Sequence, residues 1–113
     1  MCMEIGKKDI IRINAGFGGT LRNDASLDFA IEMQKNKKLG KYKKLAFIIR
    51  AILVDHPFSD GNKRTATFIS LNFAEKNSKH VDHQVLTHNI VSIAKQNITN
   101  IRDIERRLKN AIK

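Results

Sequence analysis

Residues 41–76 read KYKKLAFIIRAILVDHPFSDGNKRTATFISLNFAEK. Apolar side chains cover almost every side of residues 41–55 and recur at helical spacing over residues 62–76. A helix that is apolar nearly all round is a buried central helix. Pro57 disfavours helical geometry in the residue before it, so the first helix must end near His56. The stretch therefore predicts two long helices joined by a loop of about six residues.

Shorter helices are predicted on both sides of this pair. The first should cover residues 7–14, the second should follow an N-cap at Asp24 or Ser26, and the last should follow Asn100 or Thr99. A further helix is expected between the second long helix and the last helix. In chain order, the apolar faces of these four helices are Ile10, Ile11 and Ile13; Leu27, Ala30 and Ile31; Leu86, Ile90, Ile93 and Ala94; and Ile101, Ile104, Leu108, Ala111 and Ile112. With one proline and no strong strand pattern, the chain is expected to be an all-α bundle of about six helices.

The composition indicates one cytoplasmic domain. The chain has 113 residues, 42% of them apolar, which suits a single packed core over residues 1–113. Its one cysteine, Cys2, can form no intrachain disulfide, which fits a reducing compartment. No stretch approaches the roughly 18 apolar residues of a membrane span, and the first residues lack a signal-peptide pattern. Secretion and membrane insertion are therefore not expected.

The charge predicts an acidic partner of open class. The net charge is +10, and seven basic residues and no acid lie between Met33 and Val54: Lys35, Lys37, Lys38, Lys41, Lys43, Lys44 and Arg50. Nucleic-acid phosphate, the triphosphate of a nucleotide, or an acidic protein could use such a surface. Taken alone, such a run is better explained as a solvated lysine-rich loop.

The loop from His56 to Arg64, HPFSDGNKR, has the pattern of an anion site. It leads into a helix N-terminus, where the unpaired N–H groups of Gly61, Asn62 and Lys63 should point outward and the helix dipole attracts negative charge. Gly61 allows a phosphate to approach the backbone closely. Lys63 and Arg64 add two positive charges that suit this helix end only when an anion is bound.

Two further side chains predict what this loop does chemically. Asp60 supplies a carboxylate of the kind that Mg²⁺ takes together with substrate phosphates. His56 accepts a proton near neutral pH, which makes it the candidate base for activating a hydroxyl. Phe58 is expected to anchor the loop in the core. The loop predicts Mg²⁺-assisted transfer from a nucleotide to a hydroxyl, with the transferred group left open.

These nine residues resemble the Fic/Doc signature, His-x-Phe-x-(Asp/Glu)-(Gly/Ala)-Asn-(Gly/Lys)-Arg, at every fixed position. Residues 19–24, GTLRND, look like the Gly-x-Leu-Arg-Asp segment of the family. The resemblance implies a compact helical bundle with this loop between two central helices, and ATP and Mg²⁺ as cofactors. It also implies roles: His56 as general base, Asp60 as Mg²⁺ ligand, Gly61 and Asn62 in the anion hole, Arg64 as phosphate ligand and Phe58 as a structural residue.

Two positions favour one branch of this family. Members that transfer AMP usually carry Gly where this chain has Lys63, and often a second Arg where it has Thr67. Lys63-Arg64-Thr65-Ala66 looks like the Doc branch, the toxin of a toxin–antitoxin pair, which binds ATP in the reversed sense and phosphorylates a translation elongation factor. The resemblance therefore favours transfer of the γ-phosphate to a Ser or Thr hydroxyl over transfer of AMP.

The chain departs from the family pattern in two places. The segment between Ile31 and Leu45, where the family has a flap that aligns the target peptide, is short and lysine-rich. The self-inhibitory pattern (Ser/Thr)-x-x-x-Glu-(Gly/Asn) has no match in this sequence. Restraint is therefore expected from a separate antitoxin, and the predicted target or antitoxin contacts are Lys35, Lys37, Lys38, Lys41, Lys43 and Lys44.

Two other functions stay open at this point. The first is a protein AMP transferase with the same loop, and the second is a catalytically idle module that binds an antitoxin, DNA or RNA through its basic surface. Outside the loop, His80, His83 and His88 are expected to be structural or solvent-facing, because their spacing does not place three ligands on one helix face. Tyr42 is expected to be a core or loop anchor. The expected solvent face of the last helix is Arg102, Arg106, Arg107 and Lys109.

Overall fold

The computed structural model of the chain describes residues 5–113, so Cys2 lies outside the described residues. The helices are α1 (Lys7–Ala15), α2 (Ala25–Gln34), α3 (Lys41–Asp55), α4 (Asn62–Lys76), α5 (His83–Gln96) and α6 (Ile101–Ala111). Two isolated β-bridges occur between residues 5 and 113, and no strand. The all-α prediction is confirmed, as are both bounds of the two long helices.

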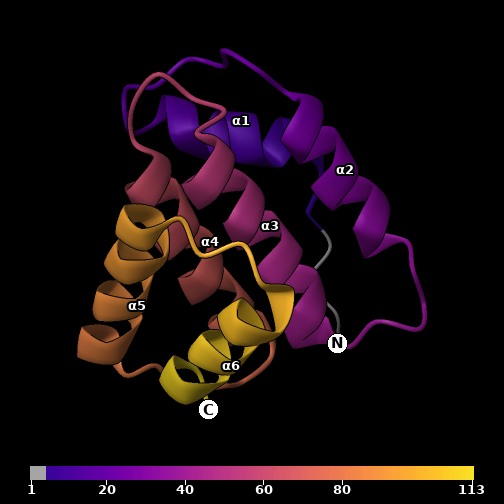
Figure 1. Cartoon of the computed structure of the whole chain (residues 1–113), viewed down its shortest axis with the longest axis vertical. Helices are drawn as coiled ribbons and strands as arrows, with labels where there is room; N and C mark the ends of the chain where they lie inside the picture. Colours follow the sequence, from indigo (N-terminus) through magenta and orange to yellow (C-terminus); the bar gives the residue numbers. More distant parts are fainter. Residues whose placement is uncertain (1–4) are drawn as a thin grey trace.

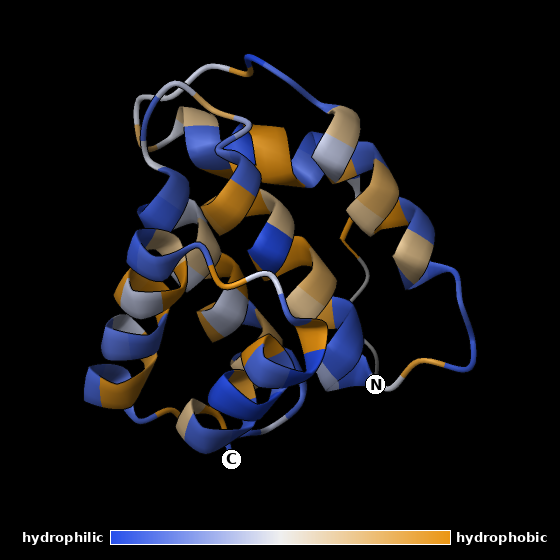
Figure 2. Ribbon diagram, in the orientation of Figure 1, coloured by the Kyte–Doolittle hydropathy of each residue, from blue (hydrophilic) through white to orange (hydrophobic). Residues whose placement is uncertain are grey.

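Helix α3 is the centre of the bundle. It packs against α2, α4, α5 and α6, which surround it in Figure 1. Its buried residues are Leu45, Ala46, Ile48, Ile49, Ala51, Ile52 and Leu53. Each fully buried Leu or Ile contributes about 1.5–3 kcal/mol relative to an exposed one, so this helix supplies much of the free energy of folding. Figure 2 shows apolar ribbon along the inside of the bundle and polar ribbon on its outer faces.

Helix α2 begins after Asp24, one of the two predicted N-cap residues. Asp24 is at the N-cap position, but its side chain does not cap the helix. It accepts a hydrogen bond from Lys7 Nζ at 2.7 Å, and the same ammonium lies 2.9 Å from Asp28. The Asp24 contact, followed by that with Asp28, raises the pKa of Lys7, and Lys7 in turn lowers the pKa of Asp24. The Asp24 carboxylate, which was expected to cap α2, thus forms an ion pair between α1 and α2 instead.

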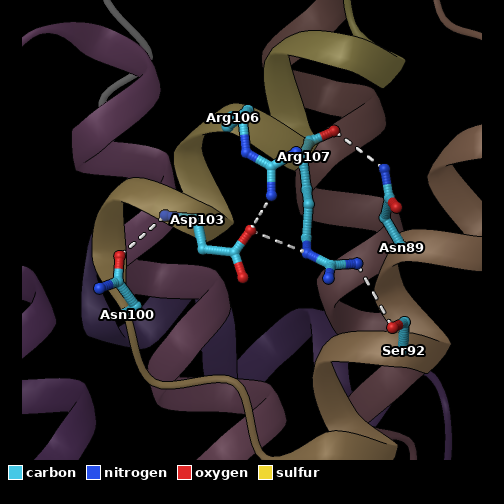
Figure 3. A network of polar contacts seen from close by, with 6 residues as sticks. All are labelled: Asn89, Ser92, Asn100, Asp103, Arg106 and Arg107. Atoms are coloured by element: carbon cyan, nitrogen blue, oxygen red, sulfur yellow. Dashed lines mark hydrogen bonds and ion pairs between the residues drawn. The ribbon is translucent and has the colours of Figure 1, made fainter.

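Helix α6 is capped as predicted, but one of its arginines is not on its solvent face. Asn100 Oδ1 accepts from the Asp103 N–H at 3.0 Å. Arg107, whose side chain is 22% exposed, donates to Asp103 at 3.2 Å and to Ser92 of α5 at 3.3 Å (Figure 3). Asn89 of α5 donates to the Arg107 carbonyl at 3.0 Å. Arg107 therefore joins α6 to α5, because polar groups of α5 face it.

Three basic residues of α6 do fit the predicted solvent face, since Arg102, Arg106 and Lys109 are exposed. Tyr42, at the start of α3, is an anchor as predicted. Its hydroxyl donates to the Ile112 carbonyl at 2.7 Å. Its ring packs edge-on against that of Phe73, with the two ring centroids 5.1 Å apart. Burial raises the pKa of the Tyr42 phenol above its ordinary value near 10.

Removing this hydroxyl should give a pH-dependent loss of stability. Tyr42→Phe is expected to lower the free energy of unfolding by about 1 kcal/mol near neutral pH, the net value of one hydrogen bond. The raised pKa means that the folded state holds the phenol proton more tightly than the unfolded state. The contribution is therefore present below about pH 10 and is lost as the pH rises through the raised pKa. Urea unfolding of both chains should show a difference that shrinks in alkaline buffer; a constant difference would contradict this account.

Candidate active site

The loop between α3 and α4 begins and ends in left-handed backbone. His56 follows α3 with φ of 47°, and Gly61 precedes α4 with φ of 73°. The first value is uncommon for a residue with a Cβ, while glycine adopts the second without steric cost. Between them, Phe58 is 1% exposed and belongs to the core. Phe58 thus lies in the core at the middle of the loop, whereas His56 and Asp60 on either side of it are exposed.

A polar cavity of about 380 Å³ opens at this loop. It is lined by Phe17, His56, Ser59, Asp60, Gly61, Asn62, Lys63 and Arg64. The structure thus gathers into one cavity the predicted base, the predicted metal ligand and every predicted phosphate-binding residue. His56, Asp60, Lys63 and Arg64 are all exposed, so their charged or titratable ends are open to a ligand.

The start of α4 offers backbone donors to an anion. Among residues 5–113, no acceptor takes the N–H groups of Asn62, Lys63 and Arg64. The Gly61 N–H, which the sequence predicted to be free, instead donates to Asp60 Oδ1 at 2.8 Å. The first turn of α4 carries no acidic residue, so the dipole of the helix is compensated there by Asp60 alone. A carboxylate oxygen already sits where a phosphate oxygen would be attracted.

The Asn62 side chain holds the loop rather than facing the cavity as a free donor. Its Nδ2 donates to the Phe58 carbonyl at 3.0 Å, and its Oδ1 accepts from the Phe58 N–H at 3.3 Å. What Asn62 can offer to an anion is therefore its backbone N–H. Of the groups of Asn62 that could take part in the predicted anion hole, only this backbone N–H is available.

A segment from the N-terminal part of the chain lines one side of the loop. Leu21 and Phe58 form an antiparallel β-bridge. Arg22 N–H donates to the Pro57 carbonyl at 2.7 Å, and Ser59 N–H donates to the Thr20 carbonyl at 2.9 Å. These contacts involve the segment that resembles the Gly-x-Leu-Arg-Asp stretch of the family. They give the loop a second backbone support besides its own core anchor.

Reasoning from the sequence assigned no role to Phe17 and Ser59, which line the cavity, or to Asn14, which supports the loop. Asn14 of α1 is fully buried, and its Nδ2 donates to the Asp60 carbonyl at 2.8 Å and to Thr65 Oγ1 at 3.1 Å. The available signal was its position four residues after Ile10, on the same helix face. A polar side chain on a core-facing surface needs a hydrogen-bond partner, but the sequence does not say which.

The cavity fits a magnesium ion held partly by substrate. Among the described residues, Asp60 is the one carboxylate that lines it. No group of three or more metal-ligating side chains occurs within residues 5–113, and His80, His83 and His88 do not come together as a site. Magnesium commonly takes one or two carboxylates and completes its shell with phosphate oxygens and water. A single carboxylate beside a phosphate site suits this mode of binding.

An apolar groove of about 310 Å³ adjoins the polar cavity. Phe17, Lys63 and Arg64 line both. The rest of the groove is formed mainly by apolar side chains of α4 and α5, including Phe68 and Val91. The rings of Phe17 and Phe68 pack edge-on, with their centroids 6.2 Å apart. A ligand with a charged end and a flat apolar end could occupy both spaces at once.

The predicted lysine contacts form a separate surface. Lys41 begins α3, whereas His56 follows its other end. Fifteen residues of helix at about 1.5 Å each place these ends roughly 20 Å apart. None of the lysines at positions 35, 37, 38, 41, 43 and 44 lines the polar cavity. In this structure the segment of residues 35–40 therefore lies away from the loop, and the support beside the loop comes from residues 20–23.

No described helix is both long and apolar enough to cross a membrane.

The sequence model of the Fic/DOC family matches residues 8–74, more than half of the chain, and this match includes the whole loop and nearly all of both long helices. No curated protein and no solved structure matches the chain. The family match covers nearly all of α1, including Asn14, and every residue that lines the polar cavity. The chain belongs to the Fic/DOC family.

Proposed function

We propose that this protein transfers the γ-phosphate of ATP to a Ser or Thr hydroxyl of another protein. The observation that carries the proposal is the polar cavity, in which a base, a carboxylate, a helix N-terminus and two cations meet: His56, Asp60, the start of α4, Lys63 and Arg64. Each group has a part in phosphoryl transfer, and family membership supports a transferase.

In the proposed reaction, the target hydroxyl oxygen attacks the γ-phosphorus while the bond to the β,γ-bridging oxygen breaks and ADP leaves. His56 accepts the hydroxyl proton as the new bond forms. Arg64, Lys63 and the N–H groups of α4 stabilise the negative charge on the phosphate oxygens. Asp60 would hold Mg²⁺, which supplies positive charge to the phosphates when bound.

Transfer of AMP is the second candidate, because the same residues would serve it with the nucleotide reversed. Lys63 and Thr67 favour phosphoryl transfer by their resemblance to the Doc branch. The apolar groove beside Lys63 and Arg64 offers a place for the base of the nucleotide, and it does not discriminate between the two reactions.

The test uses ATP labelled in two ways. Label in the γ-phosphate should appear on the target protein, and label in the adenine should not. The reverse result would replace phosphoryl transfer by AMP transfer. Absence of both labels from every protein, with ATP bound normally, would favour a binding module.

We further propose a cytoplasmic toxin whose target is a translation elongation factor and which a separate antitoxin restrains. The support is the resemblance of the loop to the Doc branch of the family. An acidic or amphipathic segment of the antitoxin would contact the surface of Lys35, Lys37, Lys38, Lys41, Lys43 and Lys44. Changing these lysines to Glu should abolish co-purification of the two chains, and unaffected co-purification would refute this contact.

Asp60 should couple ATP binding to magnesium. In calorimetric titrations, Mg²⁺ should strengthen ATP binding to the wild-type chain, and Asp60→Asn should remove about tenfold or more of that gain, because it removes the carboxylate charge. Asp55→Asn is the matched control, since Asp55 is exposed at the end of α3 and does not line the cavity. An equal Mg²⁺ effect in Asp60→Asn and wild type would remove Asp60 from this role.

A further inference from the structure

The Asn14 amide joins two parts of the chain that are far apart in sequence. From α1, Nδ2 donates both to the Asp60 carbonyl in the loop, at 2.8 Å, and to Thr65 Oγ1 in α4, at 3.1 Å. Oδ1 is buried and has no hydrogen-bond donor among the described residues. A reversed amide would set Oδ1 against the Asp60 carbonyl, two acceptors facing each other, so Nδ2 must face the loop.

Two glycines make room for this amide. A Cβ at Gly19 would overlap both Asn14 Oδ1 and the Asp60 carbonyl. A Cβ at Gly61 would lie 3.2 Å from Asn14 Nδ2 and 3.0 Å from the Cβ of Phe17. The Asn14 side chain is thus held in a close space between the turn after α1 and the loop before α4.

The position of the Asp60 carbonyl decides where the next N–H points. In a trans peptide, the carbonyl of one residue and the N–H of the next point in opposite directions. Asn14 holds the Asp60 carbonyl toward the interior. The Gly61 N–H of the same peptide is thereby aimed outward, where Asp60 Oδ1 accepts it at 2.8 Å beside the polar cavity.

We propose that Asn14 is a positioning residue for phosphate binding. It touches no phosphate itself. It fixes the peptide between Asp60 and Gly61, so that the Gly61 N–H stays directed at the cavity. When a phosphate binds, this N–H can donate its hydrogen bond to a phosphate oxygen instead of to the Asp60 carboxylate. The phosphate part of this proposal rests on the proposed function, whereas the orientation of the peptide does not.

The test compares Asn14→Leu, which is similar in size, with Thr65→Val, which removes the other acceptor of the same amide. Tripolyphosphate with Mg²⁺ serves as the probe in calorimetric titrations, and each free variant is also characterised by its thermal midpoint and by the NMR signal of the Gly61 amide. Asn14→Leu should weaken tripolyphosphate binding about 10- to 100-fold, the equivalent of one hydrogen bond to a charged group. It should also shift the Gly61 signal and speed its hydrogen exchange. Thr65→Val should lower the thermal midpoint but leave the binding constant and the Gly61 signal nearly unchanged.

A purely structural role predicts a different result, namely that both variants lose affinity in proportion to their loss of thermal stability, and this would overturn the proposal. So would an unchanged Gly61 signal in folded Asn14→Leu. If that variant fails to fold, hydrogen exchange in the wild-type chain provides the test. The Asn14 side-chain amide protons should exchange slowly if they donate to the Asp60 carbonyl, and fast exchange would contradict the proposal. If the wild-type chain does not bind tripolyphosphate, the proposed function fails, and the Gly61 signal still tests the orientation of the peptide.

Discussion

His56→Ala should lower the rate of transfer about 10²- to 10⁴-fold, the usual contribution of a positioned general base. His56 lines the polar cavity and is exposed, so removing its imidazole takes away the base without opening a hole in the core. The affinity for ATP should change little, because the phosphate contacts are assigned to Lys63, Arg64 and the start of α4. Initial rates of labelled phosphate transfer and calorimetric ATP titrations measure the two effects separately.

The matched control for this substitution is His80→Ala. His80 is also exposed, but it lines a different cavity together with Asp82 and Lys113. Its replacement should leave the transfer rate within about twofold of the wild-type rate, as expected for a surface change far from the site. Equal rates for His56→Ala and the wild-type chain would remove His56 from the role of base.

Phe58→Ala should cost about 3–5 kcal/mol of the free energy of unfolding, as is typical of truncating a buried aromatic side chain. The Phe58 ring is 1% exposed, and its backbone is bonded on both sides to the Asn62 amide. Domains of this size are stable by about 5–15 kcal/mol, so the loss is a large part of the total. Urea unfolding followed by circular dichroism measures it.

Phe29→Ala gives the comparison that separates burial from residue type. Phe29 is 51% exposed, and its ring meets that of Phe47 edge-on at 5.9 Å. Its truncation should cost only about 1 kcal/mol, mainly the loss of that ring pair and of partial burial. Equal destabilisation by the two substitutions would show that Phe58 does not anchor the loop.

The long helices could be predicted because local signals agree there with the packing. Apolar residues on nearly all sides of residues 41–55, followed by Pro57, set both the burial of α3 and its end. The two errors in the helix predictions occur where a charged side chain binds a residue of another helix instead of a local group or solvent. Asp24 binds Lys7 instead of capping α2, and Arg107 binds Ser92 instead of facing solvent. Periodicity along one helix does not show which neighbouring helix will offer a partner.

The site was predictable to the extent that it is contiguous in sequence. The polar cavity is lined almost wholly by the loop and the first turn of α4, whose residue types and spacing already indicate an anion site. Its supports are not contiguous, since Asn14 and Thr20 lie about forty residues or more before the groups they contact. The distance between the lysine-rich segment and the loop depends on the length and direction of α3, and it was therefore not visible in the charge pattern.

If the polar cavity catalyses phosphoryl transfer to a protein, the target protein must gain the mass of a phosphate. The most direct test is the intact mass of translation elongation factors, followed by that of other proteins, after incubation with this chain, ATP and Mg²⁺. We expect a gain of one phosphate with the wild-type chain and no gain with His56→Ala. A gain of one AMP, an equal gain with His56→Ala, or no gain on any protein while the chain binds ATP would contradict this expectation.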